Sequence, residues 1–188
     1  RAMLAAADHL VAVGENERIM AARELSVRPE EIPLIRLGVP VESLRVDAPM
    51  RAIGRARLGF DDSHVVLIHV GAIVPTKGLH DLLDAVGRIR AVRDNIRVLV
   101  VGGGDVEYMS ALKAQASRLG LERHIRIIGH FVPKNELPRH YAAADIGVWP
   151  GASSIATLEA MAAGLPLIVR SDDPYTAFLT SNDNGPRI

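Results

Sequence analysis

Residues 150–169, PGASSIATLEAMAAGLPLIV, form the stretch that decides the fold. A loop of small residues leads into a predicted helix that begins at Ser153 or Ser154, residue types that favour a helix N-cap. Gly164 ends the helix, and the apolar run at residues 167–169 predicts a strand directly after it. The stretch therefore indicates one helix of an α/β domain and the strand that follows it.

The start of this helix has the chemistry of an anion site. Backbone N–H groups in the first turn of a helix have no acceptor within the helix, so the Ser153-Ser154 end can offer them to phosphate oxygens. The carboxylate of Glu159, about one and a half turns further on, can accept two hydrogen bonds from a diol such as a ribose. An ordinary N-cap and a solvated glutamate fit the same residues, and both interpretations stay open at this point.

Strand and helix patterns alternate over the whole second part of the chain. Apolar runs predict strands at residues 65–70, 97–101, 125–128, 146–149 and 167–169, and helices are predicted at residues 49–58, 79–92, 106–119 and 136–144. Strands that are apolar throughout are covered on both faces, and short right-handed crossovers join them into a parallel sheet. The predicted fold class is α/β, a doubly wound parallel sheet with its ligand crevice outside the carboxyl ends of the strands.

The N-terminal part has a different pattern, with a strand predicted at residues 9–13, a helix at 15–25, a strand at 32–37 and a linker at 40–48. We therefore expect two parts, the tail of a preceding domain with its linker at residues 1–45 and a second domain at residues 46–188. Because the chain opens without Met and ends without a closing element, we expect a piece of a longer polypeptide that is truncated at its C-terminal end.

Composition narrows the classes of function. The 188 residues carry 22 basic and 22 acidic side chains, and this zero net charge argues against a general nucleic-acid-binding protein. The chain has no cysteine, which excludes disulfides and thiolate metal sites. No apolar run reaches membrane-spanning length and no signal peptide is visible, so we expect a cytoplasmic protein.

Two further loops follow predicted strands at the same edge of the sheet. Residues 70–78, VGAIVPTKG, place Lys77 at the start of a helix, where its ammonium group can neutralise phosphate oxygens or be solvated. Residues 129–134, GHFVPK, can offer backbone groups and the ring of Phe131 to a nucleobase, and an ordinary loop fits this pattern equally well.

Two classes of site are rejected on their motifs. VGGGD at residues 101–105 begins like a dinucleotide fingerprint, but Glu107 stands where a further glycine is required, so we reject a nicotinamide-dependent dehydrogenase. His130 and His140 have no carboxylate at a ligand-like spacing, and the sequence contains no Asp-x-Asp pair. No metal and no other cofactor are therefore expected.

Taken together, these segments resemble the retaining glycosyltransferases of the GT-B fold, family 4, over nearly the whole chain. The resembling stretches occur in the family's order: ADHLVAVGENERIMAARELSV, LIRLGVPVESLRVD, VGAIVPTKGLHDLLDA, VLVVGGGD, IRIIGHFVPKNELPRHYAAADIGVWP and TLEAMAAGLPLIV. Such enzymes move a sugar from UDP, GDP or another nucleotide onto an acceptor with retention at the anomeric carbon. The resemblance implies that this chain is mostly the donor-binding domain, the Rossmann-like C-terminal half of the GT-B fold.

The resemblance implies specific roles for residues of this chain. With Phe131 as the candidate nucleobase contact, the predicted donor site consists of Gly71, Lys77, Phe131, Ser153, Ser154, Ile155 and Glu159. Two positions depart from the family pattern. Ala72 replaces an arginine that usually helps Lys77 to hold the diphosphate, and Gly151 replaces the first of two glutamates. The catalytic residues are left unassigned.

The predicted function is metal-independent transfer of a sugar from a nucleotide-diphosphate donor to a glycan or lipid-linked acceptor. Lys77 and helix N–H groups would stabilise the leaving diphosphate. The missing first domain would provide the acceptor groove and any peripheral contact with a membrane, so this chain alone is expected to bind donor without transferring sugar. The departures at Ala72 and Gly151 favour an alternative, a non-catalytic nucleotide-sugar-binding domain. A GT-B nucleotide-sugar epimerase is a further alternative.

Overall fold

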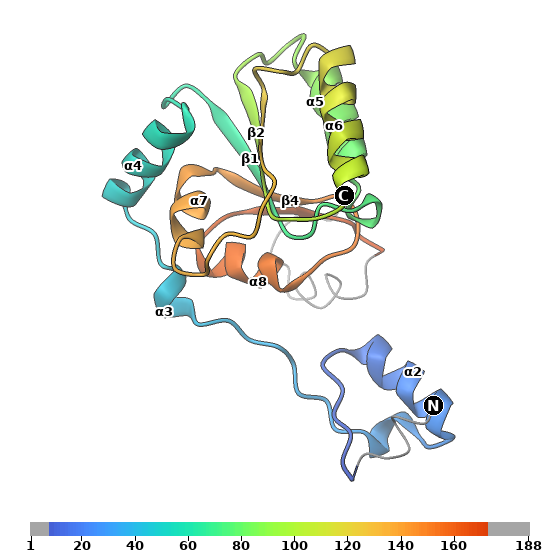
Figure 1. The fold of residues 1–188 in the computed structure, drawn as a ribbon. Helices are drawn as coiled ribbons and strands as arrows, with labels where there is room; N and C mark the ends of the chain where they lie inside the picture. The colour runs from blue at the N-terminus through green and yellow to red at the C-terminus, as the bar shows by residue number, and fades with distance from the viewer. Residues whose placement is uncertain (1–7, 173–188) are drawn as a thin grey trace. The chain divides into compact units, whose positions relative to one another are not determined.

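The structure, a computed structural model, describes residues 8–172 (Figure 1). These residues form two compact units: the first ends at Gly38 and also takes in residues 171–172, and the second runs from Val39 to Arg170. None of the described helices is long and apolar enough to cross a membrane. The predicted domain boundary after residue 45 stays a prediction.

The first unit is built around helix α2 (Glu15–Leu25), which has the predicted bounds. The helix ends at Ser26, whose left-handed backbone (φ 58°) lets its N–H group reach the last carbonyls of the helix. A single turn of 3-10 helix, η1 (Pro29–Glu31), follows. Ala12, Ala22 and Ile32 form the small buried core of this unit.

The two strands predicted in the first unit are wrong. In place of strands at residues 9–13 and 32–37, the structure has one isolated parallel bridge between Ala12 and Leu34. A pair of extended segments is marginal without further strands beside it, and Pro33 lacks the N–H group that a longer ladder would use. Apolar composition therefore indicated extended backbone here, but not a sheet.

The segment predicted as a linker contributes to the core of the second unit. It contains a short helix, α3 (Val41–Leu44). Leu44 is buried in the same apolar cluster as Phe60 and Tyr141. One leucine in a polar segment does not predict burial, which explains why the sequence pattern indicated a linker.

The second unit alternates helix and strand in the predicted order. Its elements are α4 (Ala48–Leu58), β1 (Val65–Val70), η2 (Pro75–Lys77), α5 (Leu79–Ile89), β2 (Ile96–Val101), α6 (Val106–Arg118), β3 (Ile125–Ile128), α7 (Leu137–Ala143), β4 (Ile146–Trp149), α8 (Ile155–Ala162) and β5 (Leu167–Val169). Asp47 caps the start of α4, since its carboxylate accepts a hydrogen bond from the Met50 amide at 2.7 Å. Helix α5 ends before the predicted residue 92, because Val92 is 82% exposed and belongs to no apolar face.

The strands form one parallel sheet in the order β3-β2-β1-β4-β5. Strands β2 and β3 are added on one side of β1, whereas β4 and β5 are added on the other, so the strand order reverses between β1 and β4. This confirms the predicted doubly wound sheet. The carboxyl ends of β1 and β4 form its topological switch point, where open α/β sheets bind ligands.

Each face of the sheet has its own apolar core. Helices α5 and α6 lie together on one face, with Leu83 and Leu112 buried against strand residues that include Val98. Helices α7 and α8 pack on the other face, where Tyr141 and Ala160 belong to the cluster around the strands (Figure 1). Because both faces are covered, the strands are mostly apolar, with His69, Arg97 and Arg126 as the polar exceptions, and this pattern made them predictable.

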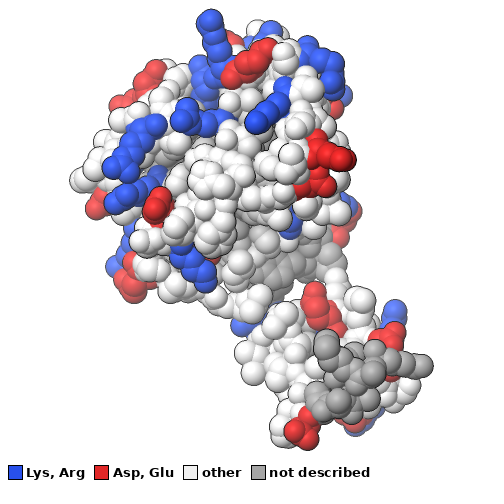
Figure 2. Space-filling view, in the orientation of Figure 1, with Lys and Arg blue, Asp and Glu red and all other residues white. Residues whose placement is uncertain are grey.

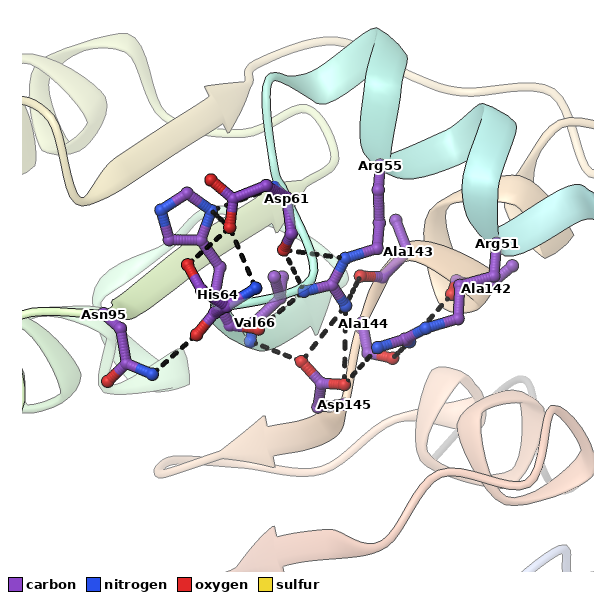
Figure 3. A network of polar contacts seen from close by, with 11 residues as sticks. Arg51, Arg55, Asp61, His64, Val66, Asn95, Ala142, Ala143, Ala144 and Asp145 are labelled. Atoms are coloured by element: carbon purple, nitrogen blue, oxygen red, sulfur yellow. Dashed lines mark hydrogen bonds and ion pairs between the residues drawn. The ribbon is translucent and has the colours of Figure 1, made fainter. Parts of the chain in front are cut away.

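A polar network joins α4 to the amino-terminal ends of β1 and β4 (Figure 3). Arg51 Nη2 lies 2.5 Å from Asp145 Oδ1, and Arg55 Nη1 lies 3.4 Å from Asp145 Oδ2. The same carboxylate accepts a hydrogen bond from the Val66 amide at 2.7 Å. Arg55 is 2% exposed and donates further hydrogen bonds to the Asp61 and His64 carbonyls. The network fixes the edge of the sheet opposite the switch point.

Exchange of Asp145 for asparagine should lower the free energy of unfolding at pH 7 by about 1–2 kcal/mol, because buried Arg55 loses its counter-charge. The loss is smaller than for a fully buried ion pair, because the Asp145 side chain is 28% exposed and water screens its charge. Burial alone would raise the pKa of Asp145, but the Val66 amide and the two arginines hold it below 3.8. The stabilisation is therefore complete above that ordinary value and is lost as the pH falls through the lower folded-state pKa.

Urea unfolding of wild type and variant at pH 7 and at decreasing pH below 4 would measure this contribution. The difference between the two proteins should shrink as the pH falls. Asp62→Asn is the matched control, because Asp62 is exposed in the loop between α4 and β1. It should leave the free energy of unfolding unchanged at every pH. Equal stability of wild type and Asp145→Asn at pH 7 would contradict this account of the network.

Candidate functional site

The candidate site lies at the carboxyl ends of β1 and β4. The loop after β1 runs from Gly71 through η2 to Gly78, whose left-handed backbone (φ 66°) starts α5. The loop after β4 packs directly on it, with the Ala152 amide donating a hydrogen bond to the Thr76 carbonyl at 2.9 Å. Two loops that are about 75 residues apart in sequence are thereby joined at the switch point.

Glycine at position 151 permits this contact. Gly151 is buried, and a Cβ atom there would lie 2.3 Å from the Thr76 carbonyl oxygen and 2.5 Å from the Lys77 carbonyl carbon. No side chain fits at residue 151 in this loop conformation. The departure from the family pattern at Gly151 therefore has a structural consequence, which is close backbone packing of the two loops.

Lys77 connects the two loops by its side chain. Its Nζ donates hydrogen bonds to the Ala152 carbonyl at 2.7 Å and to the Ser153 carbonyl at 3.1 Å. These carbonyls immediately precede α8, so a cation is held beside the positive end of that helix. Lys77 and Ser153, predicted separately from two motifs, are thus neighbours in the structure.

Helix α8 begins as the sequence predicted. Ser154 is its N-cap with extended backbone (φ −154°, ψ 176°), and the Thr157 amide donates to the Ser154 carbonyl at 3.0 Å. The amides of Ile155 and Ala156 precede any helical acceptor, and no described residue accepts a hydrogen bond from them. These two N–H groups and the Lys77 ammonium provide positive potential for an anion.

Glu159 lies on α8 and is held by a buried tyrosine. The Tyr141 hydroxyl, from α7, donates a hydrogen bond to Glu159 Oε2 at 2.9 Å. Burial raises the pKa of Tyr141, and the Glu159 charge and this hydrogen bond raise it further, so the hydroxyl stays protonated and remains a donor. Glu159 is half-buried. Its carboxylate therefore has a fixed orientation, and its second oxygen and remaining lone pairs can accept hydrogen bonds from a ligand.

The other predicted residues occupy different places. Gly71 follows β1 with a positive φ of 151° and has only side-chain atoms of His69 and Ser154 near the position of a Cβ. Phe131 follows β3, the outermost strand on its side, and is 80% exposed. The exposed ring of Phe131 is available to a ligand, and its place in the donor site stays a prediction.

Two residues of the site were not predicted from the sequence. In the sequence, Tyr141 fits the apolar face of α7. Nothing in the local pattern indicates that its hydroxyl donates a hydrogen bond to Glu159, 18 residues later. His69 does carry a signal, because it is a polar residue inside the apolar strand VVLIHV, two positions before Gly71. Its ring is fully buried beneath the switch point.

Charge is mixed on the face of the molecule that Figure 2 shows. On the face shown in Figure 2, Lys and Arg side chains are interspersed with Asp and Glu. Within residues 8–172, no group of three or more His, Asp or Glu side chains is placed to hold a metal ion. The independence of the site from metals stays a prediction.

The chain is similar in sequence to known proteins over most of its length. A family model described as "Glycosyl transferases group 1" matches residues 50–186. The chain is 33% identical over 141 residues to the GDP-mannose-dependent alpha-(1-6)-phosphatidylinositol monomannoside mannosyltransferase of Mycolicibacterium smegmatis, covering 70% of this chain and 36% of that protein. It is 32% identical over 176 residues to the D-inositol 3-phosphate glycosyltransferase of Geodermatophilus obscurus, covering 88% of this chain and 38% of that protein. The chain thus spans well under half of either relative.

Solved structures show the same fold. WaaG, a glycosyltransferase involved in lipopolysaccharide biosynthesis, superimposes with a TM-score of 0.80 at 22% identity, over 95% of this chain and 48% of that one. Anabaena HepE in complex with UDP and glucose superimposes with a TM-score of 0.78 at 22% identity, over 91% of this chain and 46% of that one. Both comparisons agree with the GT-B fold predicted from the sequence.

Proposed function

The chain belongs to the group 1 glycosyl transferases, and on this premise we propose that residues 46–188 bind a nucleotide-diphosphate sugar as donor for a retaining hexosyl transfer. The diphosphate lies between the Lys77 ammonium and the start of α8, and the ribose lies on Glu159. The acceptor is a glycan or a lipid-linked acceptor bound mainly by a further domain of the whole protein, which also makes any contact with a membrane surface.

The position of Lys77 is the observation that carries this proposal. Its Nζ lies 2.7 Å from the Ala152 carbonyl and 3.1 Å from that of Ser153, at the entrance to α8 and at the switch point of the sheet. A side-chain cation and a helix N-terminus are two independent sources of attraction for a diphosphate. Their convergence at the edge where α/β sheets bind ligands favours a nucleotide over an uncharged ligand.

The same groups suit the chemistry of transfer. When the bond between the anomeric carbon and the diphosphate oxygen breaks, negative charge grows on the leaving oxygen. Lys77 and the amides of Ile155 and Ala156 would stabilise that charge without reorganising. Similarity to a mannosyltransferase that uses GDP-mannose, and to HepE bound to UDP and glucose, supports a nucleotide sugar as donor. The names of the two relatives support an acceptor hydroxyl on a polyol or lipid headgroup.

A second candidate function is a donor-binding domain without transferase activity. The close packing at Gly151 favours it, because a glutamate cannot be accommodated at that position in this loop. A nucleotide-sugar epimerase is the third candidate. Product analysis with a donor labelled in the sugar, using the longest natural polypeptide that contains this chain, separates the three: transfer to an acceptor, an epimerised donor, or unchanged donor.

Lys77→Ala should weaken the binding of nucleoside diphosphates by about tenfold or more and that of nucleoside monophosphates by clearly less, because a cation beside α8 acts on the whole diphosphate charge. The measurement is calorimetric titration of the 188-residue chain with UDP, GDP and the matching monophosphates, in the presence and absence of EDTA. We expect EDTA to have no effect on wild type. Lys113→Ala, on the exposed surface of α6, is the matched control. A strict requirement for magnesium or manganese, or equal losses for diphosphates and monophosphates, would contradict the proposed role.

A further inference from the structure

A buried histidine lies directly beneath the candidate site. His69 is on β1, two residues before Gly71, and its side chain is 0% exposed. Its Nδ1 lies 3.0 Å from the Val148 carbonyl oxygen on the neighbouring strand β4, and its ring is tilted against that of Trp149 at 5.8 Å. The strand runs into the switch point immediately after this residue, so the histidine sits at the base of the loops that form the site.

The contact with Val148 determines the tautomer of the ring. A carbonyl oxygen only accepts hydrogen bonds, so Nδ1 of His69 carries a hydrogen and donates it. In the neutral ring, Nε2 is then an acceptor with a free lone pair. Nε2 is buried and has no hydrogen-bond partner within residues 8–172. Such an unsatisfied buried atom is costly, which suggests a partner that arrives with a ligand.

Nε2 is directed toward the proposed diphosphate site. A Cβ atom built on Gly71 would lie 3.4 Å from His69 Nε2 and 3.7 Å from the Ser154 hydroxyl oxygen. The space that a side chain would fill at residue 71 is therefore bordered by the histidine on one side and by the N-cap of α8 on the other. Lys77 is the charged group that acts on this ring, whereas β4 and α8 present to it the Val148 carbonyl, Trp149 and Ser154, none of which titrates between pH 5 and 8.

The negative charge of a diphosphate favours one protonation state of His69 over the other. A neutral Nε2 directs a lone pair toward the site, which repels the oxygens of an approaching diphosphate. A protonated Nε2 instead offers a donor and a positive charge, and both are favourable to the anion. We propose that donor binding is coupled to proton uptake: a diphosphate at the Gly71–α8 edge binds together with one proton from the solvent, which Nε2 of His69 takes up. This inference rests on the proposed function and makes His69 a ligand-binding residue whose protonation regulates affinity.

The coupling has a definite pH dependence. In the protein without ligand, burial, together with the charge of Lys77, lowers the pKa of His69 to about 4, so the ring is neutral at pH 6–8. A bound diphosphate offsets the Lys77 charge and favours the imidazolium, which raises the pKa of His69 in the complex. Affinity must then increase as the pH falls through the higher, bound-state pKa. If that value returns to 6.5, affinity rises about tenfold between pH 8 and pH 5.5.

Calorimetric titration of the 188-residue chain with UDP-glucose and with GDP-mannose tests the coupling. The phosphates of these donors are esterified and stay fully ionised between pH 5.5 and 8, so the ligand itself does not take up protons. Titration at pH 6.5 in two buffers of different ionisation enthalpy gives the number of protons bound. We expect about half a proton per donor at pH 6.5, almost none at pH 8, and the tenfold gain in affinity toward pH 5.5.

Two variants assign the proton to His69. His69→Asn keeps an N–H group for the Val148 carbonyl and removes Nε2, whereas His69→Phe keeps the ring volume and removes both nitrogens. Both should bind donor with affinity that changes less than twofold with pH, and both should be about tenfold weaker than wild type at pH 5.5. Thermal unfolding shows whether each variant folds. If one variant does not fold, the binding measurements on the other variant decide the question.

Four results would overturn the inference. Donor binding by wild type without proton uptake would contradict the coupling and leave the proposed function intact. If donor affinity is independent of pH in both wild type and His69→Asn, and is lower in the variant, Nε2 acts as a neutral acceptor for a ligand hydroxyl. If proton uptake persists in both variants, another group takes up the proton. If neither nucleotide sugar binds at any pH, the inference and the proposed function both fail.

Discussion

Replacement of Glu159 by glutamine should weaken the binding of a nucleotide-diphosphate sugar by roughly 30- to 1,000-fold, or about 2–4 kcal/mol. The reason is the loss of two charge-assisted hydrogen bonds from the ribose hydroxyls to the carboxylate. Glutamine keeps an oxygen that can accept the hydrogen bond from Tyr141, so the fold around α8 should be preserved. The effect should therefore appear in affinity and not in stability.

Calorimetry with the better-binding of UDP-glucose and GDP-mannose measures this effect. Glu107→Gln, which removes an exposed carboxylate from the first turn of α6, is the matched control and should bind like wild type. Tyr141→Phe should give a smaller loss than Glu159→Gln, because it releases the carboxylate without removing it. Equal affinity of wild type and Glu159→Gln would remove Glu159 from the site.

Replacement of Gly102 by alanine should lower the free energy of unfolding of the second unit by about 4 kcal/mol. Gly102 follows β2 with a positive φ of 146°, which side chains rarely adopt, and a Cβ atom there would lie 2.0 Å from the Gly71 carbonyl oxygen. Neither backbone can move freely, because the Gly102 amide donates to the Ile128 carbonyl and the Gly71 amide donates to the Val101 carbonyl. The substitution must therefore separate the loops after β1 and β2.

The neighbouring glycine provides the control. A Cβ atom at Gly103 would have its nearest contact at 3.7 Å, to the Phe131 amide nitrogen, which is an ordinary van der Waals distance. Gly103→Ala should consequently change stability by less than about 1 kcal/mol. Urea unfolding of both variants tests the pair. A loss of stability in Gly103→Ala that matches the loss in Gly102→Ala would contradict the assignment of the clash to Gly71.

The parts of the fold that could be predicted are those in which local pattern and burial agree. Strands β1, β3, β4 and β5 were predicted with their observed bounds, because strands covered on both faces are apolar at nearly every position. The order of loops along the chain then placed Lys77 and the Ser153-Ser154 segment at one edge of the sheet, and the structure holds Lys77 Nζ 3.1 Å from the Ser153 carbonyl. Fold class and the neighbourhood of these residues thus followed from the sequence alone.

The parts that could not be predicted depend on contacts between distant residues. The prediction of two N-terminal strands was wrong, because an extended segment forms a strand only beside partner segments, and composition does not reveal these partners. Leu44 was assigned to a linker, although it packs into the core of the second unit. The VGGGD glycines let the loops after β1 and β2 pair, with the Ile73 amide donating to the Gly103 carbonyl, and the local pattern does not reveal this contact. The hydrogen bond from Tyr141 to Glu159 could not be predicted for the same reason, since it joins residues on different helices.

An amide chemical-shift titration of the ¹⁵N-labelled chain with UDP-glucose and with GDP-mannose tests the central claim most directly. If a nucleotide sugar binds at the switch point of the sheet, the largest shifts should fall on residues 71–78 and 152–159, with the amides of Lys77, Ile155 and Ala156 among them. Residues of α4 near Arg51 and Arg55, at the opposite edge, should be unaffected. Absence of shifts at saturating donor, or shifts centred on that opposite edge, would contradict the proposed site.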